Sequence, residues 1–231
     1  KKKNVPIIFF NRELVEEDLE RWDKLYYVGA DAKESGVLQG ELAAAYLKAH
    51  PEADRNQDGV IQYVVLEGEA GHQDAILRTE YAASTLKERG IALEKLGYAL
   101  ANWNRSQAQT QVQQLLQSYG AQIELILANN DDMALGALDA YRASNIPLPP
   151  IFGIDGTEPG LAAVRDKSLT GTVKNNGIGQ AEAMLSLALS LAAGEKSAYT
   201  LDRGKYIRIP YEAVSADKDS SMTVRSTELS R

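Results

Sequence analysis

The feature that most constrains this sequence is a regular alternation of short apolar runs with longer stretches of helical periodicity. The runs QYVVLEG, IELILAN and PIFGID have the length and the β-branched content of buried strands. The stretches between them, such as QDAILRTEYAASTLKERG, space their apolar residues as one face of a helix does. Because alternating strands and helices form parallel sheets with helices on both faces, we predict an α/β fold.

The expected strands divide the chain into two units. Residues 31–174 contain five of them and form a self-contained doubly wound unit. Residues 1–30 and 176–211 offer strands and a helix that this unit does not need, so we assign them to a second, incomplete sheet. Apolar residues there, such as Ile7, Phe9, Met184 and Leu187, are expected to lack a partner surface. The five strands are expected at residues 62–67, 92–99, 123–128, 150–154 and 171–174.

Charge and composition exclude several classes of protein. The 231 residues carry a net charge of −7, whereas a nucleic-acid-binding surface needs an excess of Lys and Arg, so we expect no nucleic-acid partner. There is no cysteine, which excludes disulfides and thiolate metal sites. No apolar run approaches the roughly 20 residues needed to span a bilayer.

The stretch ADRNQDGVIQ predicts a calcium-binding loop directly in front of a strand. Its spacing matches the first nine positions of an EF-hand loop, including the glycine that allows the turn. The twelfth position, a glutamate in an EF-hand, is Val65 here. The competing interpretation is a solvated turn rich in Asp and Asn. The candidate ligands are Asp54, Asn56, Asp58, the Val60 carbonyl and Gln62.

This loop is one or two oxygens short of the six to eight that calcium prefers. In a sheet of strand order 2-1-3-4-5, the first and third strands are parallel neighbours and start side by side. Gln62 opens the first of these strands and Glu124 opens the third. We therefore expect Glu124 to complete the coordination shell.

Polar and aromatic residues follow the expected strands at the opposite end of the sheet, where open parallel sheets bind ligands. Asn11 follows the first strand of the chain in the same way. The residues are His72, Asp74 and Arg78 after the first strand of the unit, Trp103 after the second, Asn129 and Asn130 after the third, Asp155 at the end of the fourth, and Asn175 after the fifth.

These residue types suit a neutral sugar. A sugar hydroxyl both donates and accepts hydrogen bonds; carboxylates accept, guanidinium groups donate and amides do both. A tryptophan offers a flat apolar face to the ring. Asp74 and Arg78 lie four residues apart on one helix, so we expect them to brace each other. Taken singly, each residue has a structural explanation as well; Asn130, for example, could be a helix N-cap.

At these residues the chain resembles the bacterial periplasmic glucose/galactose-binding proteins. The motifs VPIIFFN, YYVGADAKESGVLQG, DRNQDGVIQ, GHQDAILR, IELILANNDDMALGA, IFGID and GTVKNN carry the resemblance. It implies a type I periplasmic binding protein fold of two lobes joined by three crossings, with one lobe incomplete here. Residues 1–30 and 176–211 then belong to the first lobe, 31–174 to the second, and 212–231 to a return crossing and a tail whose residues 215–231 have no assigned role.

The resemblance also implies a function and a set of binding residues. It implies a non-enzymatic protein that binds D-glucose or D-galactose between its lobes and delivers it to the permease of a membrane ABC transporter. A chemoreceptor is a further potential partner, the expected location is periplasmic or otherwise extracytoplasmic, and the complete protein is expected to be a monomer. The implied calcium is structural, and its ligands are those given above with Glu124. The implied sugar contacts are Asn11, His72, Asp74, Arg78, Trp103, Asn130, Asp155 and Asn175.

Two other classes of protein remain open. The ligand-binding core of a LacI-type transcriptional repressor has a similar fold but needs a helix-turn-helix, which this sequence does not display. A glycosidase could use Asp74 and Asp155 as paired carboxylates, but one of the two must be protonated, and Arg78 beside Asp74 works against that. Gln73 stands where the sugar-binding family commonly has proline, which is expected to loosen that turn.

Overall fold

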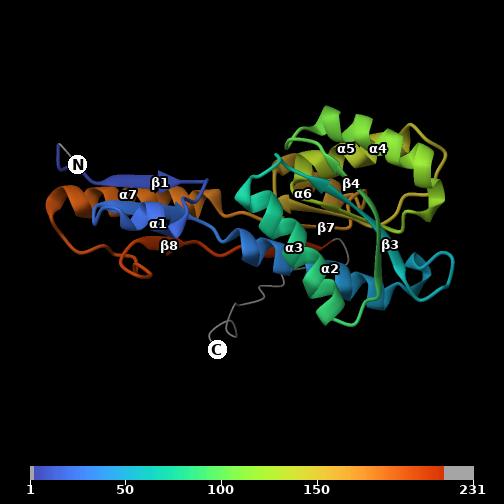
Figure 1. Ribbon diagram of the computed structural model, residues 1–231, viewed down its shortest axis with the longest axis horizontal. Helices are drawn as coiled ribbons and strands as arrows, with labels where there is room; N and C mark the ends of the chain where they lie inside the picture. Colours follow the sequence, from blue (N-terminus) through green and yellow to red (C-terminus); the bar gives the residue numbers. More distant parts are fainter. Residues whose placement is uncertain (1–2, 216–231) are drawn as a thin grey trace. The chain divides into compact units, whose positions relative to one another are not determined.

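The computed structural model describes residues 3–215, which divide into two compact units. The first unit comprises residues 3–31 and 176–211, and the second comprises residues 32–175 and 212–215. Both are built on parallel strands with helices packed against them (Figure 1), as expected of an α/β periplasmic binding protein-like fold. Among the described residues, no helix is long and apolar enough to cross a membrane.

The second unit carries a six-stranded sheet of order β4-β3-β5-β6-β7-β9. Its first five strands are parallel and follow the predicted 2-1-3-4-5 order. The elements are α2 (Ala32–Ala49), the 3-10 helix η1 (Pro51–Ala53), β3 (Ile61–Glu67), α3 (Gln73–Glu88), β4 (Leu93–Leu100), α4 (Arg105–Tyr119), the 3-10 helix η2 (Gly120–Gln122), β5 (Leu125–Ala128), α5 (Asp131–Arg142), β6 (Ile151–Asp155), α6 (Glu158–Arg165), β7 (Gly171–Lys174) and β9 (Glu212–Ser215).

The sixth strand, β9, was not predicted. It runs antiparallel to β7, with Val214 opposite Thr172, whereas residues 212–231 were assigned to a crossing and a tail. Its four residues, EAVS, are too short and too mixed in polarity to give a strand signal. The chain also reaches this strand only after passing through the other unit, so sequence order does not suggest the pairing. The rest of the tail lies outside the described residues.

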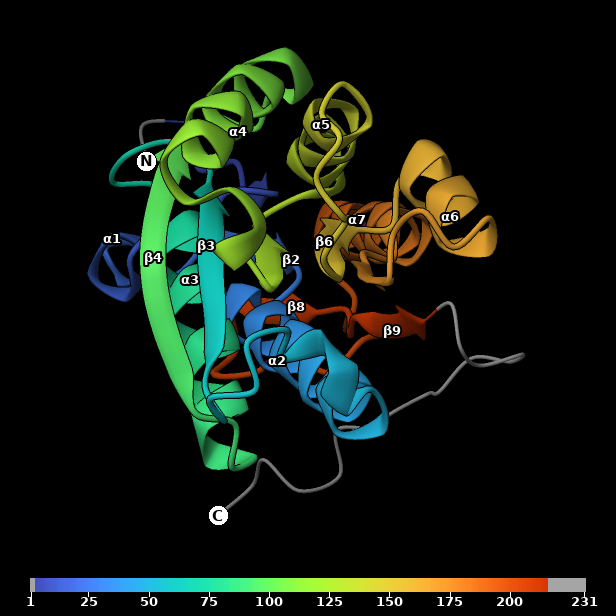
Figure 2. The same cartoon turned by 90° about the vertical axis from the view of Figure 1, so that its right-hand side faces the viewer.

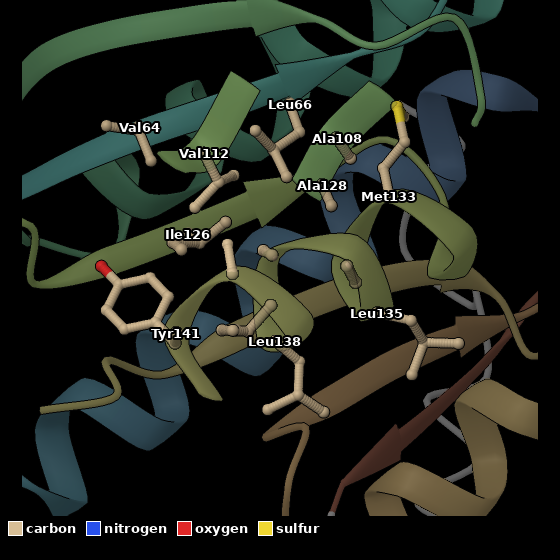
Figure 3. Packing of buried hydrophobic residues seen from close by; sticks show 14 of the residues in the cluster. Val64, Leu66, Ala108, Val112, Ile126, Ala128, Met133, Leu135, Leu138 and Tyr141 are labelled. Carbon is tan, nitrogen blue, oxygen red and sulfur yellow. The ribbon is translucent and has the colours of Figure 1, made fainter. Parts of the chain in front are cut away.

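Helices cover both faces of this sheet (Figure 2). On one face, α2 and α3 pack on side chains such as Tyr63, Val65 and Leu127. On the other, α4, α5 and α6 pack on Val64, Leu66 and Ile126, whose neighbours are drawn in Figure 3. Successive residues of β3 therefore enter opposite cores, which explains why its sequence is apolar throughout instead of alternating.

The first unit is smaller and has a three-stranded parallel sheet of order β1-β2-β8. Val28 and Ile207 on one face pack against Ala183 and Leu187 of a long helix. The expectation that Leu187 would lack a partner is therefore wrong, because Leu187 packs on this face of the sheet and is fully buried. The elements are β1 (Ile7–Phe10), α1 (Glu16–Glu20), β2 (Leu25–Gly29), α7 (Gly177–Ala193) and β8 (Tyr206–Arg208).

Truncating the centre of the larger core should destabilise the protein strongly. Ile126 is fully buried among α4 and α5, so Ile126→Ala is expected to lower the free energy of unfolding by about 2–5 kcal/mol. Leu148→Ala, at a residue that is 41% exposed, is the control and should change it by less than about 1 kcal/mol. Urea denaturation followed by circular dichroism measures both. Equal decreases in the two variants would contradict this description of the core.

Candidate functional site

The side chains that follow β3, β4, β5 and β6 meet at the carboxyl ends of these strands. His72 is the N-cap of the helix after β3, and its Nδ1 accepts the backbone N–H of Asp74 at 3.2 Å. This cap fixes the start of α3 and so places Asp74 in its first turn and Arg78 one turn further on. The helix thus presents both residues at the same end of the sheet.

Arg78 lies at the centre of the cluster and is only 5% exposed. Its Nη1 donates to the Asn129 carbonyl at 2.7 Å and to Asp155 Oδ1 at 3.3 Å, and its guanidinium carbon lies 5.8 Å from the centre of the Trp103 ring. One cation therefore connects the ends of β5 and β6 with the loop after β4. The sequence pointed only to Asp74 as a carboxylate near Arg78, because Asp155 is remote in the chain.

The position of Trp103 depends on a left-handed backbone conformation and on the space that a glycine leaves for its ring. Asn102 and Trp103 both have left-handed backbone conformations, with φ of 51° and 62°. The indole lies so close to Gly68, at the end of β3, that a Cβ there would come within 2.1 Å of a ring atom. The ring also meets His72 edge-on, with the ring centres 5.2 Å apart. The sequence identified Trp103 but gave no sign that Gly68 makes room for it.

Asn130 has a structural role and also contacts the cluster. Its Oδ1 accepts the Met133 backbone N–H at 3.0 Å, which caps α5, and its Nδ2 lies 3.4 Å from the Trp103 carbonyl. The N-cap explanation weighed from the sequence is therefore part of its role. The neighbouring Asn129, which is buried, accepts the Gly68 N–H at 3.2 Å. Asn129 thus joins the end of β5 to the end of β3, and Asn130 joins it to the loop after β4.

Asp155 occupies an unusual backbone conformation at the end of β6, with φ of 107°. Burial raises the pKa of its carboxyl group, Arg78 opposes this rise, and the charges of Asp74 and Asp132 add to it. The backbone N–H of Asn175 donates to the Asp155 carbonyl at 2.9 Å, so Asn175 follows β7 directly beside it. Asn11 belongs to the other unit, where its carbonyl accepts the Tyr27 hydroxyl at 2.9 Å.

One buried carboxylate beside this cluster is not identified by the sequence analysis. Asp131 is fully buried, and burial raises the pKa of its carboxyl group to about 6, against hydrogen bonds from Thr172 and Thr157 that lower it. Only the charge of the nearby Asp155 raises it further. In the sequence Asp131 reads as a helix residue after the Asn130 cap, so nothing there indicates its burial.

The predicted metal ligands gather at the amino ends of β3 and β5. Glu124 is 1% exposed; its Oε1 accepts the Arg55 N–H at 2.6 Å and its Oε2 accepts the Gln62 N–H at 3.1 Å. Asp58 Oδ2 accepts hydrogen bonds from the amides of Asn56 and Gln62, both at 2.9 Å. The carboxylate of Glu124 therefore reaches the loop, as the strand order required.

The composition of this cluster suits a hard cation such as calcium, because every potential ligand is an oxygen. The Asp54 carboxylate accepts hydrogen bonds from the backbone N–H groups of Asp58 and Gly59. The Asp58 carboxylate accepts the Val60 N–H, which lowers the pKa of Asp58. Among residues 3–215, no three His, Cys, Asp or Glu side chains form a metal-binding group by themselves. Amide and carbonyl oxygens would therefore have to complete the shell, and the calcium site stays a prediction.

Comparison with known proteins places the chain in a family. A family model described as periplasmic binding protein domain matches residues 1–196. The chain belongs to the periplasmic binding proteins. They bind solutes and are not enzymes, in agreement with the sequence prediction.

Several members of the family resemble the chain. The D-galactose/methyl-galactoside binding periplasmic protein MglB of Haemophilus influenzae is 40% identical over 95% of this chain and 67% of its own length. The xylitol-binding protein of Mycolicibacterium smegmatis is 32% identical over 84% of this chain and 51% of its own. A solute binding protein of an ABC transporter from Bacillus halodurans, solved with bound myo-inositol, has a TM-score of 0.77 and 29% identity, covering 93% of this chain and 67% of that one. The chain thus spans half to two thirds of the length of these relatives.

The raised pKa of Asp131 predicts a specific dependence of stability on pH. Its folded-state pKa of about 6 exceeds the ordinary value of 3.8, so its stabilising contribution is full below pH 3.8 and is lost as the pH rises through 6. Relative to Asp131→Asn, the wild type should lose on the order of 2–3 kcal/mol of unfolding free energy between about pH 4 and pH 7. Urea denaturation of both proteins across this range measures the difference. A constant difference would show that the carboxyl group titrates normally.

Proposed function

We propose that this protein binds a hexose, D-glucose or D-galactose, reversibly and delivers it to the permease of a membrane ABC transporter. The observation that carries the proposal is the cluster at the strand ends, where Arg78 lies against Asp155 and Trp103. Asp74 and Asp155 supply acceptors, Arg78 supplies donors, and Asn130 supplies both, which is what vicinal hydroxyl groups require. Trp103 adds a flat apolar face for the ring.

The choice of a hexose is supported by the similarity to MglB of Haemophilus influenzae, the galactoside-binding relative described above. Other members of the family are described as binding xylitol, ribose or myo-inositol, so polyols and pentoses are the ligands to be tested against it. The sugar contacts that we propose are His72, Asp74, Arg78, Trp103, Asn130, Asp155 and Asn175, and the resemblance implies Asn11 as a further one.

The family also supports the proposed partner and location. MglB is described as a periplasmic protein and the Bacillus halodurans protein as a solute binding protein of an ABC transporter, so we assign this protein to the space outside the cytoplasm, with a transporter permease as its protein partner. A chemoreceptor is a second potential partner for the sugar-bound form. Nothing in the comparisons supports the alternative of a repressor core.

The proposed calcium has a structural role that is separate from sugar binding. The seven residues of β3 separate the two ends of the sheet by about 20 Å, so the ion cannot contact the sugar. It would hold the loop 54–62 against the buried Glu124, at the amino ends of the two strands. We assign its ligands to Asp54, Asn56, Asp58, Val60, Gln62 and Glu124.

Truncating the side chains that face the sugar should weaken binding. Asp74→Ala should cost about 1.5–3 kcal/mol, because a charged hydrogen bond to the sugar is removed. Trp103→Ala should cost about 1–3 kcal/mol, by analogy with the stacking of bases on aromatic residues. Glu80→Ala, an exposed residue of the same helix as Asp74, is the control and should leave the affinity unchanged.

Isothermal titration calorimetry with D-glucose, D-galactose, xylitol, ribose and myo-inositol tests the assignment. The wild type should prefer the hexoses, and both site variants should bind them more weakly than the control does. Unchanged affinity in both variants would place the site elsewhere, whereas tight binding of only a polyol or a pentose would refute the hexose.

Chelation should affect stability far more than sugar affinity. At a calcium concentration of a hundred times Kd, the bound ion adds about 2.7 kcal/mol, so EDTA should lower the Tm by several degrees. Glu124→Gln should reproduce most of that decrease, whereas Glu52→Gln, at an exposed side chain nearby, should not. Differential scanning calorimetry with and without EDTA gives the result. A Tm that does not move on chelation would leave the loop as a turn without a metal.

A further inference from the structure

Within residues 3–215, Asp131 is the one fully buried carboxylate beside the proposed sugar site to which the binding chemistry assigns no role. Its Oδ1 accepts the Thr172 hydroxyl at 2.5 Å. Its Oδ2 accepts the Thr157 backbone N–H at 2.7 Å and the Thr157 hydroxyl at 3.2 Å. It therefore joins the start of α5, the turn between β6 and α6, and the middle of β7. Burying a carboxylate is costly, so its retention here calls for a reason beyond packing.

The turn that Asp131 holds is the one that carries Asp155. Asp155 has φ of 107° and the next residue, Gly156, has φ of 63°, after which Thr157 caps α6. A residue other than glycine, such as Asp155, adopts this backbone conformation only where its surroundings enforce it. Two of the three contacts of Asp131 hold Thr157, which lies two residues beyond Asp155 at the start of α6, and the third holds Thr172 of the neighbouring strand β7.

Two glycines give the Asp131 carboxylate its space. A Cβ on Gly153 would lie 2.3 Å from Oδ1, and a Cβ on Gly160 would lie 2.2 Å from Oδ2. The carboxylate is thus enclosed between β6 and α6, with one hydrogen bond to Oδ1 and two to Oδ2. Such an enclosure fixes the position of the turn and leaves the carboxylate out of reach of a ligand.

We propose that Asp131 is a positioning residue for sugar binding, which holds Asp155 in the orientation that faces Arg78 and the ligand. This inference rests on the proposed function and extends it to a residue that does not touch the sugar. Asparagine should replace Asp131 with little effect on affinity, because its amide oxygen can accept from Thr157 and its amide nitrogen can donate to Thr172. Alanine can do neither and should release the turn.

A double-mutant cycle in the full-length protein tests this assignment. Calorimetry with D-glucose and D-galactose measures the affinities. Asp131→Ala should lower the affinity about tenfold or more, and Asp131→Asn should stay within about threefold of the wild type. Because Asp131 acts through Asp155, Asp131→Ala should cost less than about threefold in an Asp155→Asn background. Asp166→Ala, at an exposed aspartate after α6, is the matched control and should stay within about threefold.

The remaining outcomes each decide a separate point. Wild-type affinity in Asp131→Ala, or the full tenfold decrease in the Asp155→Asn background, would overturn the inference. If Asp131→Ala does not fold, Thr172→Val replaces it, because this variant removes one of the three hydrogen bonds. Thr172→Val should lower the affinity about threefold or more, again only when Asp155 is present; an unchanged affinity would overturn the inference.

If the wild type binds neither hexose, the proposed function fails, and hydrogen exchange of the Asn175 amide then tests the inference by itself. It should accelerate in Asp131→Ala, because this amide donates to the Asp155 carbonyl; an unchanged rate would overturn the inference.

Discussion

The architecture of the second unit depends on the burial of β5 in the interior of its sheet. All four residues of this strand are buried, between β3 on one side and β6 on the other, with helices over both faces. Such a strand has no solvent-facing side on which to place a functional group, so polar residues can stand only at its two ends. Glu124 stands at one end and Asn129 and Asn130 at the other. The separation of a candidate metal site from a candidate sugar site follows from that geometry.

The buried ionisable groups beside β5 differ in the hydrogen-bond partners that stabilise them. Arg78 is placed where a carbonyl and the carboxylate of Asp155 both accept from it, and Glu124 is surrounded by backbone N–H groups. Asp131 accepts hydrogen bonds from Thr157 and Thr172, but burial outweighs them and raises the pKa of its carboxyl group to about 6.

The sequence predicts the fold class and the strand order of the second unit because its signals are local and repeated. A buried strand needs an apolar run and a parallel neighbour needs a crossover helix, and both are visible in single stretches such as IELILAN and DMALGALDAYR. Most members of the candidate site follow in turn, since the ends of parallel strands share one edge. The comparisons confirm the family that these motifs indicated.

What the sequence does not reveal depends on contacts between remote residues. The pairing of Arg78 with Asp155, the packing of Trp103 on Gly68 and the burial of Asp131 each join segments that are separated by two or more elements. The burial of Leu187 requires knowing that α7 lies across the first unit's sheet. None of these contacts leaves a pattern within a window of ten or twenty residues.

The edge strand β9 has a consequence for the order in which the molecule can be assembled. Residues 32–175 are continuous and can form their five parallel strands as soon as they reach the compartment in which the protein folds, whereas β9 arrives only after the last segment of the other unit. The open side of β7 therefore stays without its antiparallel partner for the whole of that interval, and an unpaired edge is a surface on which chains can join incorrectly. The last strand of residues 3–215 is thus the one that covers the open edge of the larger sheet.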